Sequence, residues 1–388
     1  MTTDHVEQPA TAKPRARDLL HLPGEPGPHN AITDVAGVTV GTETLIHGTG
    51  ARRPGEGPVR TGVTAILPRG RSGVGRPCAA ASYSLNGNGE LTGTTWIEES
   101  GSLTMPVVLS NTHALGACHT GVVEWVNEVH PRLAEQWLLP VCGETWDGYL
   151  NDINGAHVQP HHVRAALDSA SPGAVAEGSV GGGTGMSCYA YKGGNGTSSR
   201  RVRYGASTYT VGAFVQANFG SRDELVVLGS PIGRDLGDDN PMETTDWFER
   251  DLGGGRVPGG AGSVIVVVAT DAPLLPHQCK ALARRVPLGL ARTGTTGSHF
   301  SGDIFLAFST ADADGLASRM SPPATELSTL QFVPWSGMDP FFTAVVESVE
   351  EAVLNALVVN EDMIGRDDHR SPALPHDVLS RLPAARTS

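Results

Sequence analysis

The sequence is poor in cysteine and in clustered basic charge, and each shortage excludes a class of protein. Its five cysteines are an odd number with no CxxC pair, so neither a disulfide framework nor a zinc site is expected. Lys and Arg number 28 against 41 Asp and Glu, a net charge of −13 that argues against nucleic acid or an anionic membrane as a partner. No segment has the length of a membrane span or the pattern of a signal peptide, so we expect a cytoplasmic protein.

Apolar residues and turn-forming residues are abundant. The chain has 388 residues, of which 39% are hydrophobic, enough to bury a sizeable core. Its 49 glycines and 27 prolines are spread between apolar runs, as in a loop-rich folded protein. We expect residues 1–16 to form a disordered arm and residues 17–388 a single domain.

Hydrophobic periodicity predicts a mixture of strands and helices. Strand-like runs cover residues 30–42, 62–68, 105–110, 137–145, 206–220, 224–229, 263–270 and 304–310. Helical spacing is present over residues 114–130, 160–170, 273–292 and 341–358.

Two motifs that suggest ligands are weak. The segment "EGSVGGGTGM", residues 177–186, lacks the Lys-Ser/Thr ending of a phosphate-binding P-loop, so we interpret it as a close-packed turn beneath a site. His161 and His162 are adjacent, and they therefore lack the i, i+4 spacing of a helical metal site. We expect neither a metal nor a cofactor.

A serine stands at the end of the longest polar stretch. Residues 231–262 are acidic and glycine-rich and read as a flexible linker, and Ser263 then begins an unbroken apolar run to Ala269. A linker of about 30 residues inside a folded chain is unusual unless it is functional or is cut. If the bond after Gly262 breaks, Ser263 gains a free α-amine with a reference pKa of about 7.7 to 8.0, which can take the proton of its own hydroxyl. The alternative is that Ser263 only begins a strand after a turn.

Several long segments resemble one family. "RARDLLHLPGEPGPHNAITDVAGVTVGTETLI", "NGNGELTGTTWIEESG", "PVVLSNTHALG", "EGSVGGGTGMSCYAYKGG", "GSVIVVVATDAPLLPHQCKALARR" and "SGDIFLAFSTA" occur in the order seen in the DmpA/BapA family. These self-processing aminopeptidases include the L-aminopeptidase D-amidase/D-esterase and the β-peptidyl aminopeptidases. The resemblance implies an α/β fold, a four-layer αββα sandwich similar to that of the N-terminal nucleophile hydrolases but with different connectivity.

The resemblance also implies a cleavage site and a catalytic group. Processing between Gly262 and Ser263 would give an α chain of residues 1–262 and a β chain of residues 263–388. Ser301 and Asp303 match the family's "SG(D/E)" motif, whose side chains hydrogen-bond around the nucleophile and tune its amine. Asn218 matches the asparagine that donates into the oxyanion hole.

Substrate recognition is implied at the segment "GETWDGY". Glu144 matches the glutamate whose carboxylate binds the free ammonium group of the substrate, and Trp146 stands where the family has tyrosine. An indole cannot act as a phenol does, which leaves the role of Trp146 open, and Tyr149 follows shortly after. The implied substrates are short peptides, amides or esters with a free amine, β-amino acyl and D-residue types included. The implied assembly is a homo-oligomer.

Three alternatives remain at this point. An ornithine acetyltransferase-like enzyme would cut at an Ala-Thr bond, which the chain offers at Ala269-Thr270 but without a glycine-rich leader. A nylon-oligomer hydrolase would not require Glu144 for an ammonium group. A non-catalytic relative would keep the fold and never cleave.

Overall fold

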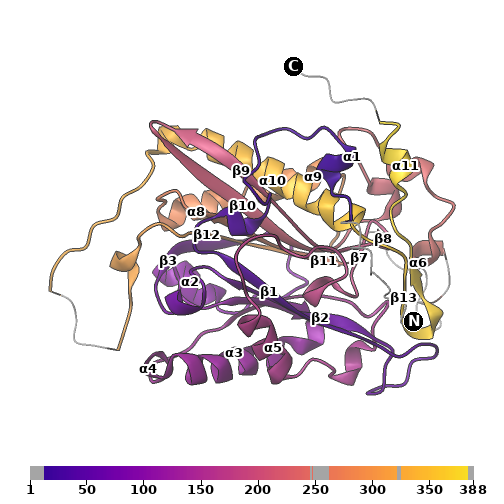
Figure 1. Cartoon of the computed structure of the whole chain (residues 1–388), viewed down its shortest axis with the longest axis horizontal. Coiled ribbons are helices and arrows are strands. Elements are labelled where there is room, and N and C mark those ends of the chain that lie inside the picture. The colour runs from indigo at the N-terminus through magenta and orange to yellow at the C-terminus, as the bar shows by residue number, and fades with distance from the viewer. Residues whose placement is uncertain (1–12, 245–246, 248–261, 321–324, 383–388) are drawn as a thin grey trace, which may run out of the picture.

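Four layers of secondary structure form the molecule. The computed structural model describes residues 13–244, 247, 262–320 and 325–382. From top to bottom, Figure 1 shows a helical layer, a six-stranded sheet, a four-stranded sheet and a second helical layer. The upper layer contains α8 (Pro276–Ala283), α9 (Val286–Arg292) and α10 (Asp339–Val358), and the lower layer contains α3 (Leu115–Val129) and α5 (Pro160–Asp168). The arrangement confirms the predicted αββα sandwich.

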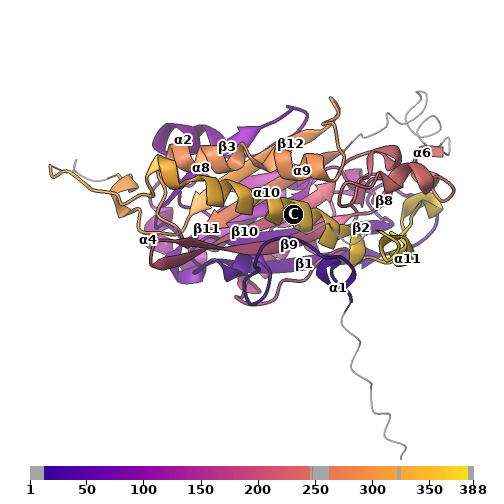
Figure 2. The same ribbon diagram turned by 90° about the horizontal axis from the view of Figure 1, so that it is seen from above.

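The larger sheet carries the predicted nucleophile on a central strand. Its order is β4 (Ser102–Leu103), β3 (Cys78–Ser84), β12 (Gly302–Ser309), β11 (Ser263–Thr270), β10 (Ser207–Asn218) and β9 (Gly194–Tyr204). Strand β11 runs parallel to β12 and antiparallel to β10. Figure 2, turned by 90°, shows α8, α9 and α10 lying across this sheet.

The smaller sheet has the order β1 (Thr39–His47), β2 (Val59–Leu67), β5 (Val107–Asn111) and β6 (Val141–Thr145). Its outer face packs against α3 and α5, and its inner face packs against the larger sheet. The remaining short elements are α1 (Ala16–Leu19), α2 (Thr94–Ser100), α4 (Pro131–Ala134), α6 (Pro241–Thr244), α11 (His376–Leu379), β7 (Ser187–Cys188), β8 (Tyr191–Lys192), β13 (Met363–Ile364) and β14 (Arg370–Ser371).

The apolar run after Ser263 follows from this layering. Along β11, Val264, Val266 and Val268 face the upper helices. Ile265, Val267 and Ala269 face the space between the two sheets. Because both faces of β11 are covered, the strand needs apolar side chains at successive positions rather than at alternate ones.

Three predicted elements differ from the structure. The strand expected over residues 30–42 begins only at Thr39, because residues 32–34 form a 3₁₀ turn in which the Asp34 carboxylate accepts the N–H of Ala31. The helix expected over residues 273–292 is two helices, α8 and α9. Pro287 lies in the first turn of α9, where a residue without an N–H is tolerated, whereas inside one continuous helix it would remove a hydrogen bond. The strand expected over residues 224–229 is a turn closed by a bridge between Val227 and Ser230, with Leu228 in the left-handed region at φ 48°. The apolar side chains of Leu225 and Val227 are buried there without a ladder.

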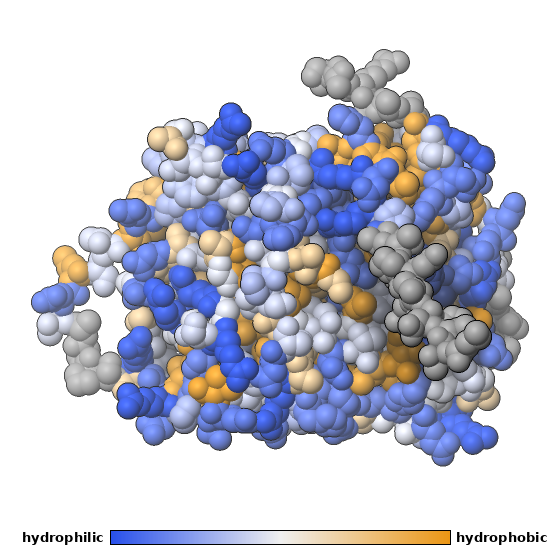
Figure 3. Space-filling view, in the orientation of Figure 1, coloured by the Kyte–Doolittle hydropathy of each residue, from blue (hydrophilic) through white to orange (hydrophobic). Residues whose placement is uncertain are grey.

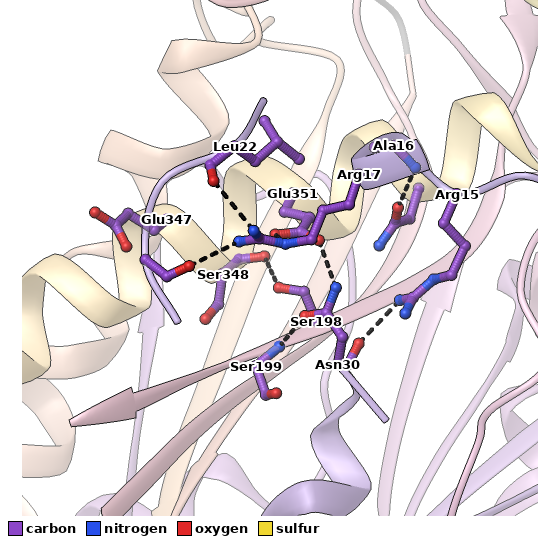
Figure 4. A network of polar contacts seen from close by, with 12 residues as sticks. Arg15, Ala16, Arg17, Leu22, Asn30, Ser198, Ser199, Glu347, Ser348 and Glu351 are labelled. Atoms are coloured by element: carbon purple, nitrogen blue, oxygen red, sulfur yellow. Dashed lines mark hydrogen bonds and ion pairs between the residues drawn. The ribbon is translucent and has the colours of Figure 1, made fainter. Parts of the chain in front are cut away.

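The structure corrects the predicted boundary of the N-terminal arm at residues 15 and 16. Ala16 is buried in α1 and its N–H donates to Asn355 on α10, while the Arg17 guanidinium binds both oxygens of Glu351 at 2.9 Å. Figure 4 shows these residues converging on α10, with the Asn30 side chain donating to the same carboxylate. Residues 15 and 16 therefore belong to the folded body, and residues 1–12 lie outside the described residues.

The predicted linker over residues 231–262 is also partly folded. Residues 232–235 form a 3₁₀ turn, residues 241–244 form α6, and the Trp247 side chain is buried. Residues 245–246 and 248–261 lie outside the described residues. Within the described chain, none of the helices combines the length and hydropathy needed to cross a membrane.

Candidate active site

Ser263 lies at the first position of β11, at one end of the larger sheet. It pairs with Asn218 on β10 and with Gly302 on β12, and its side chain is buried. Its hydroxyl donates to the carbonyl oxygen of Gly262 at 2.8 Å and accepts from the N–H of Gly302 at 3.2 Å. The hydroxyl oxygen is therefore held beside the carbonyl group that precedes it.

The residue before Ser263 has no room for a side chain. A Cβ atom on Gly262 would lie 1.9 Å from the carbonyl oxygen of Asn218 and 3.0 Å from the Cα atom of Phe219. Both neighbours are backbone atoms in or beside β10, which cannot move without disturbing the strand. The sequence requirement for glycine here is thus a requirement for close approach of two backbones.

Ser301 and Asp303 meet at the start of β12. The Ser301 hydroxyl donates to the Asp303 carboxylate, and Asp303 pairs with Val264, the residue after Ser263. Burial raises the pKa of Asp303, and hydrogen bonds from Ser301 and Asn86 act in the opposite direction. The structure thus brings these two predicted site residues beside the strand end that carries Ser263.

The loop of residues 86–89 was missed as a site element, although "NGNG" is part of the segment that carries the resemblance. Asn86 donates from its Nδ2 to Asp303 Oδ2 at 3.0 Å and accepts the Asp303 N–H at 2.6 Å. Gly89 packs between the two sheets: a Cβ atom there would lie 2.8 Å from the Cα atom of Gly302 and 3.2 Å from Glu144 Oε1. The loop therefore joins the Ser263 strand end to the predicted ammonium site.

Glu144 lies near the end of β6 in the smaller sheet and is 2% exposed. Its Oε1 accepts the N–H of Glu90 at 2.9 Å, and its Oε2 accepts the hydroxyl of Thr112, a second residue that the sequence did not single out. Burial raises its pKa. Among the described residues no Lys or Arg forms an ion pair with this carboxylate. A cationic group of a ligand could therefore supply the partner that a buried charge needs.

Asn218 closes β10 with its side chain held at both ends. Its Oδ1 accepts the N–H of Ser187 at 2.9 Å, and its Nδ2 donates to the carbonyl oxygen of Trp146 at 2.8 Å. Within the described chain the second hydrogen on Nδ2 has no acceptor. The Asn218 side-chain amide is thus oriented beside Ser263, and one of its two N–H groups is available to a ligand.

A buried lysine, Lys192, is linked to the Asn218 side chain through the peptide unit of Met186 and Ser187. Lys192 is 0% exposed, and its Nζ donates to the carbonyl oxygens of Met186 at 2.6 Å and Gly193 at 2.7 Å. The carbonyl of Met186 and the N–H of Ser187 belong to one peptide unit, so Lys192 polarises the group that donates to Asn218. Aligned hydrogen bonds of this kind strengthen one another.

Trp146 contributes its backbone to the site more directly than its side chain. Its carbonyl accepts from Asn218, while its indole lies against Gly148 and stacks on Trp247 with ring centroids 6.4 Å apart. Tyr149 does not take the place of the family's tyrosine, because its hydroxyl donates to the carbonyl of Arg370 and its ring stacks on His369.

The alternative cleavage point lies at the other end of β11. Thr270 is fully buried and paired with Val211 and Ser309, and its hydroxyl donates to the carbonyl of Thr210. The bond between Ala269 and Thr270 therefore lies within a strand that is paired on both sides, which disfavours the acetyltransferase-like alternative.

The glycine-rich segment of residues 177–186 is the close-packed turn that the sequence predicted. A Cβ atom on Gly182 would lie 2.1 Å from Gln216 Oε1, and one on Gly183 would lie 2.3 Å from the backbone nitrogen of Asn195. Across the described ranges, no three His, Cys, Asp or Glu side chains gather as metal ligands do. All five cysteines are buried and free.

The chain is similar to known proteins over most of its length. The model of "Peptidase family S58" matches residues 30–371. A β-peptidyl aminopeptidase BapA of Sphingosinicella microcystinivorans is 45% identical over 370 residues, covering 95% of this chain and 91% of the relative. The solved L-aminopeptidase D-Ala-esterase/amidase of Ochrobactrum anthropi, described as a new variant of the Ntn hydrolase fold, is 44% identical with a TM-score of 0.84 over 95% of this chain and 97% of its own.

A second solved structure, the β-aminopeptidase of a Burkholderia species, is 43% identical with a TM-score of 0.83, covering 94% of this chain and 97% of its own. These matches span nearly the whole chain, and the two structural matches share its layered architecture. The chain therefore belongs to peptidase family S58 and is a hydrolase of the aminopeptidase type.

Proposed function

We propose that the chain cuts itself between Gly262 and Ser263 and then acts as an N-terminal serine aminopeptidase. The observation that carries the proposal is the hydroxyl of Ser263, 2.8 Å from the Gly262 carbonyl oxygen at a strand end next to Asn218. Since a glycine is sterically required before this serine, the chain is built to bring the hydroxyl and that carbonyl together.

Self-cleavage would begin with attack of Ser263 Oγ on the carbonyl carbon of Gly262. The new C–O bond forms as the C–N bond breaks and the hydroxyl proton passes to the departing nitrogen, which leaves an ester and a neutral α-amine on Ser263. Water then hydrolyses the ester, giving a carboxylate on Gly262 and the free hydroxyl of Ser263. The second N–H of Asn218 Nδ2 would stabilise the oxyanion of the first step, and its position at the strand end beside Ser263 supports this role.

Substrate hydrolysis would reuse the same groups. The α-amine of Ser263 takes the hydroxyl proton, Oγ attacks the substrate carbonyl, and the proton passes to the departing amine. Water then attacks the acyl ester and releases the acid. Ser301 and Asp303 would hold a negative charge near the α-amine and stabilise its protonated form during transfer.

Glu144 would select substrates with a free amine. Its carboxylate is buried without a cationic partner among the described residues, so an ammonium group is the ligand that offsets its desolvation. Relatives named as β-peptidyl aminopeptidases support short β-amino acyl peptides and amides as substrates, and the match to the D-Ala-esterase/amidase supports D-residue amides and esters. Trp146 would line the same pocket beside Glu144.

The deciding experiment is the denatured mass of the freshly purified protein. We expect two chains, residues 1–262 and 263–388, in place of one chain of 40.5 kDa. Ser263→Ala should remain whole and inactive, while Thr270→Ala should still cut at Gly262. A split before Thr270, or a wild-type chain that stays whole and yet hydrolyses amino-acyl anilides, would refute the proposal.

The proposal extends to the setting of the enzyme. Five free, buried cysteines suit the reducing cytoplasm, and the high net negative charge gives nucleic acid and anionic membranes no general attraction. We further propose a homo-oligomer of processed units, since large apolar side chains such as Leu288, Phe332 and Trp335 are about half exposed. Light scattering after size-exclusion chromatography tests the assembly.

A further inference from the structure

A cavity lies between α2, α4 and residues 318–319, away from Ser263. Its volume is about 270 Å³, which is smaller than a typical drug-binding pocket. In Figure 1, α2 and α4 are at the lower left, and in Figure 3 apolar residues reach the surface in this region, as they do at several other places on the same face.

The cavity is separate from the site of Ser263 because it lies at the opposite end of the larger sheet. Strand β4, which contributes Ser102, pairs with Cys78 and Ala79 at the start of β3, whereas Ser84 at the end of β3 pairs with Ile304 near Ser301. At ~3.3 Å per residue, five residues of strand place the two ends roughly 17 Å apart.

The charged side chains that line the cavity are positive, whereas the chain as a whole carries a net negative charge. Three arginines line it, Arg76, Arg132 and Arg319, and its lining includes neither Asp nor Glu. Arg76 has one long ion pair with Asp314, at 3.5 Å and largely exposed. Arg132 and Arg319 form no ion pair with any described residue. In a protein with 41 acidic and 28 basic residues, such a cluster marks a place for an anion.

The walls of the cavity are apolar and aromatic. The Trp96 and Trp137 rings meet edge to face with centroids 6.1 Å apart, and Met105 and Leu133 cover another part of the lining. Ser102 also lines the cavity, is 3% exposed, and its hydroxyl has no hydrogen-bond partner among the described residues. A buried hydroxyl without a partner costs free energy, which a polar group of a ligand can recover.

We propose that this cavity binds a small carboxylate that carries an aromatic or branched apolar group. The planar guanidinium groups match a carboxylate, the tryptophans and aliphatic side chains match the apolar group, and the Ser102 hydroxyl matches a further acceptor. Because no acidic side chain lines the cavity, a ligand with a free ammonium group finds no partner there. The ligand is therefore of the N-acyl amino acid or aryl-carboxylate class, chemically distinct from the amines that Glu144 would accept.

The test compares N-acetyl-L-phenylalanine with its uncharged amide by isothermal titration calorimetry on the Ser263→Ala protein. We expect the acid to bind at millimolar concentrations or better, the amide to bind more weakly by about tenfold or more, and tryptophan fluorescence to change with the acid. The double variant Arg132→Gln/Arg319→Gln should weaken binding of the acid by a similar factor, and Trp96→Phe should reduce the fluorescence change. Arg53→Gln, at an exposed arginine elsewhere, is the matched control.

Each opposite result overturns the proposal: no heat of binding for the acid, equal binding of acid and amide, or unchanged binding in the arginine double variant. Because the Ser263→Ala background has no nucleophile, a positive or negative result here is independent of the aminopeptidase mechanism.

Discussion

The Cα atom of Gly262 and the carbonyl oxygen of Asn218 approach so closely that a Cβ atom on residue 262 would lie 1.9 Å from that oxygen. Asn218 is also the β10 partner of Ser263. One contact therefore fixes both the backbone that enters the proposed cleavage site and the strand end that presents the proposed oxyanion donor.

Gly262→Ala should slow self-cleavage strongly, because the added methyl group must push the chain before Ser263 away from β10 and so misplace the carbonyl to be attacked. A misplacement of about 1 Å costs roughly 10²-fold in rate. Denaturing gel electrophoresis after timed incubation should show a persistent whole chain. Gly237→Ala is the control, since a Cβ atom there meets nothing within 4 Å; equal cleavage of the two variants would contradict the steric argument.

Asn218→Ala should lower the turnover number of the processed enzyme by roughly 10²–10³, with a much smaller effect on KM, because an oxyanion donor acts in the transition state. Processing should slow as well, so the kinetics are measured on chains separated from uncut precursor. A rise in KM at constant turnover number would show instead that Asn218 only positions the substrate.

Lys192→Met should lower stability by about 1–3 kcal/mol, since it removes two buried hydrogen bonds at roughly 0.5–1.5 kcal/mol each. The carbonyl of Met186 keeps the N–H of Gly193 as a donor, and the carbonyl of Gly193 keeps the side chain of Asn360. The turnover number should also fall, because the donor to Asn218 is weakened. Burial lowers the pKa of Lys192 to about 7, with Cys188 and Asp147 facing it. The folded protein therefore binds fewer protons than the unfolded chain above pH 7, and the free energy of unfolding rises with pH from this group.

The measurement for Lys192 is chemical denaturation of both proteins between pH 7 and 8.5, in the Ser263→Ala background. The stability of the parent relative to Lys192→Met should increase over this range, by at most about 1.4 kcal/mol per pH unit. A difference that stays flat with pH would mean that Lys192 does not change its charge there.

The four-layer fold was predicted from the resemblance to the family, whereas the buried strand that begins at Ser263 could be predicted from the local sequence alone. The run from Val264 to Ala269 is apolar at successive positions, which is typical of a strand covered on both faces. The small residues before Ser263 indicate where the preceding polar segment ends and the strand begins. The turn at Gly182 and Gly183 was predictable for the same reason, since clustered glycines imply close backbone approach.

The supporting residues could not be predicted, because they are brought together by pairing between distant segments. Asn86 reaches Asp303 across 217 residues, and Thr112 reaches Glu144 from a different strand end. Lys192 reads as an ordinary surface lysine until the fold buries it. The apolar segment of residues 224–229 was wrong as a strand because its side chains are buried by turns, which periodicity does not distinguish from a short ladder.

Glu144→Gln should raise KM for substrates with a free amine by about 10- to 100-fold, the loss of one charge-assisted hydrogen bond. Burial raises the pKa of Glu144, so in the parent enzyme the carboxylate is protonated at a higher pH than an ordinary glutamate, and KM should rise on acidification from above the usual glutamate range. The variant should lack this dependence. Glu56→Gln, at an exposed glutamate that is paired with exposed Arg53, is the control.

The same substitution should not destabilise the unliganded protein at neutral pH. Folding raises the pKa of Glu144, so the free energy of unfolding falls as pH rises through that pKa, because the folded protein then holds a charge that burial disfavours. Glutamine keeps the shape and removes the charge, so in the Ser263→Ala background its melting temperature at pH 7 should equal or exceed that of the parent. Lower stability together with an unchanged KM would mean that Glu144 serves the packing between the two sheets and that the substrate ammonium binds elsewhere.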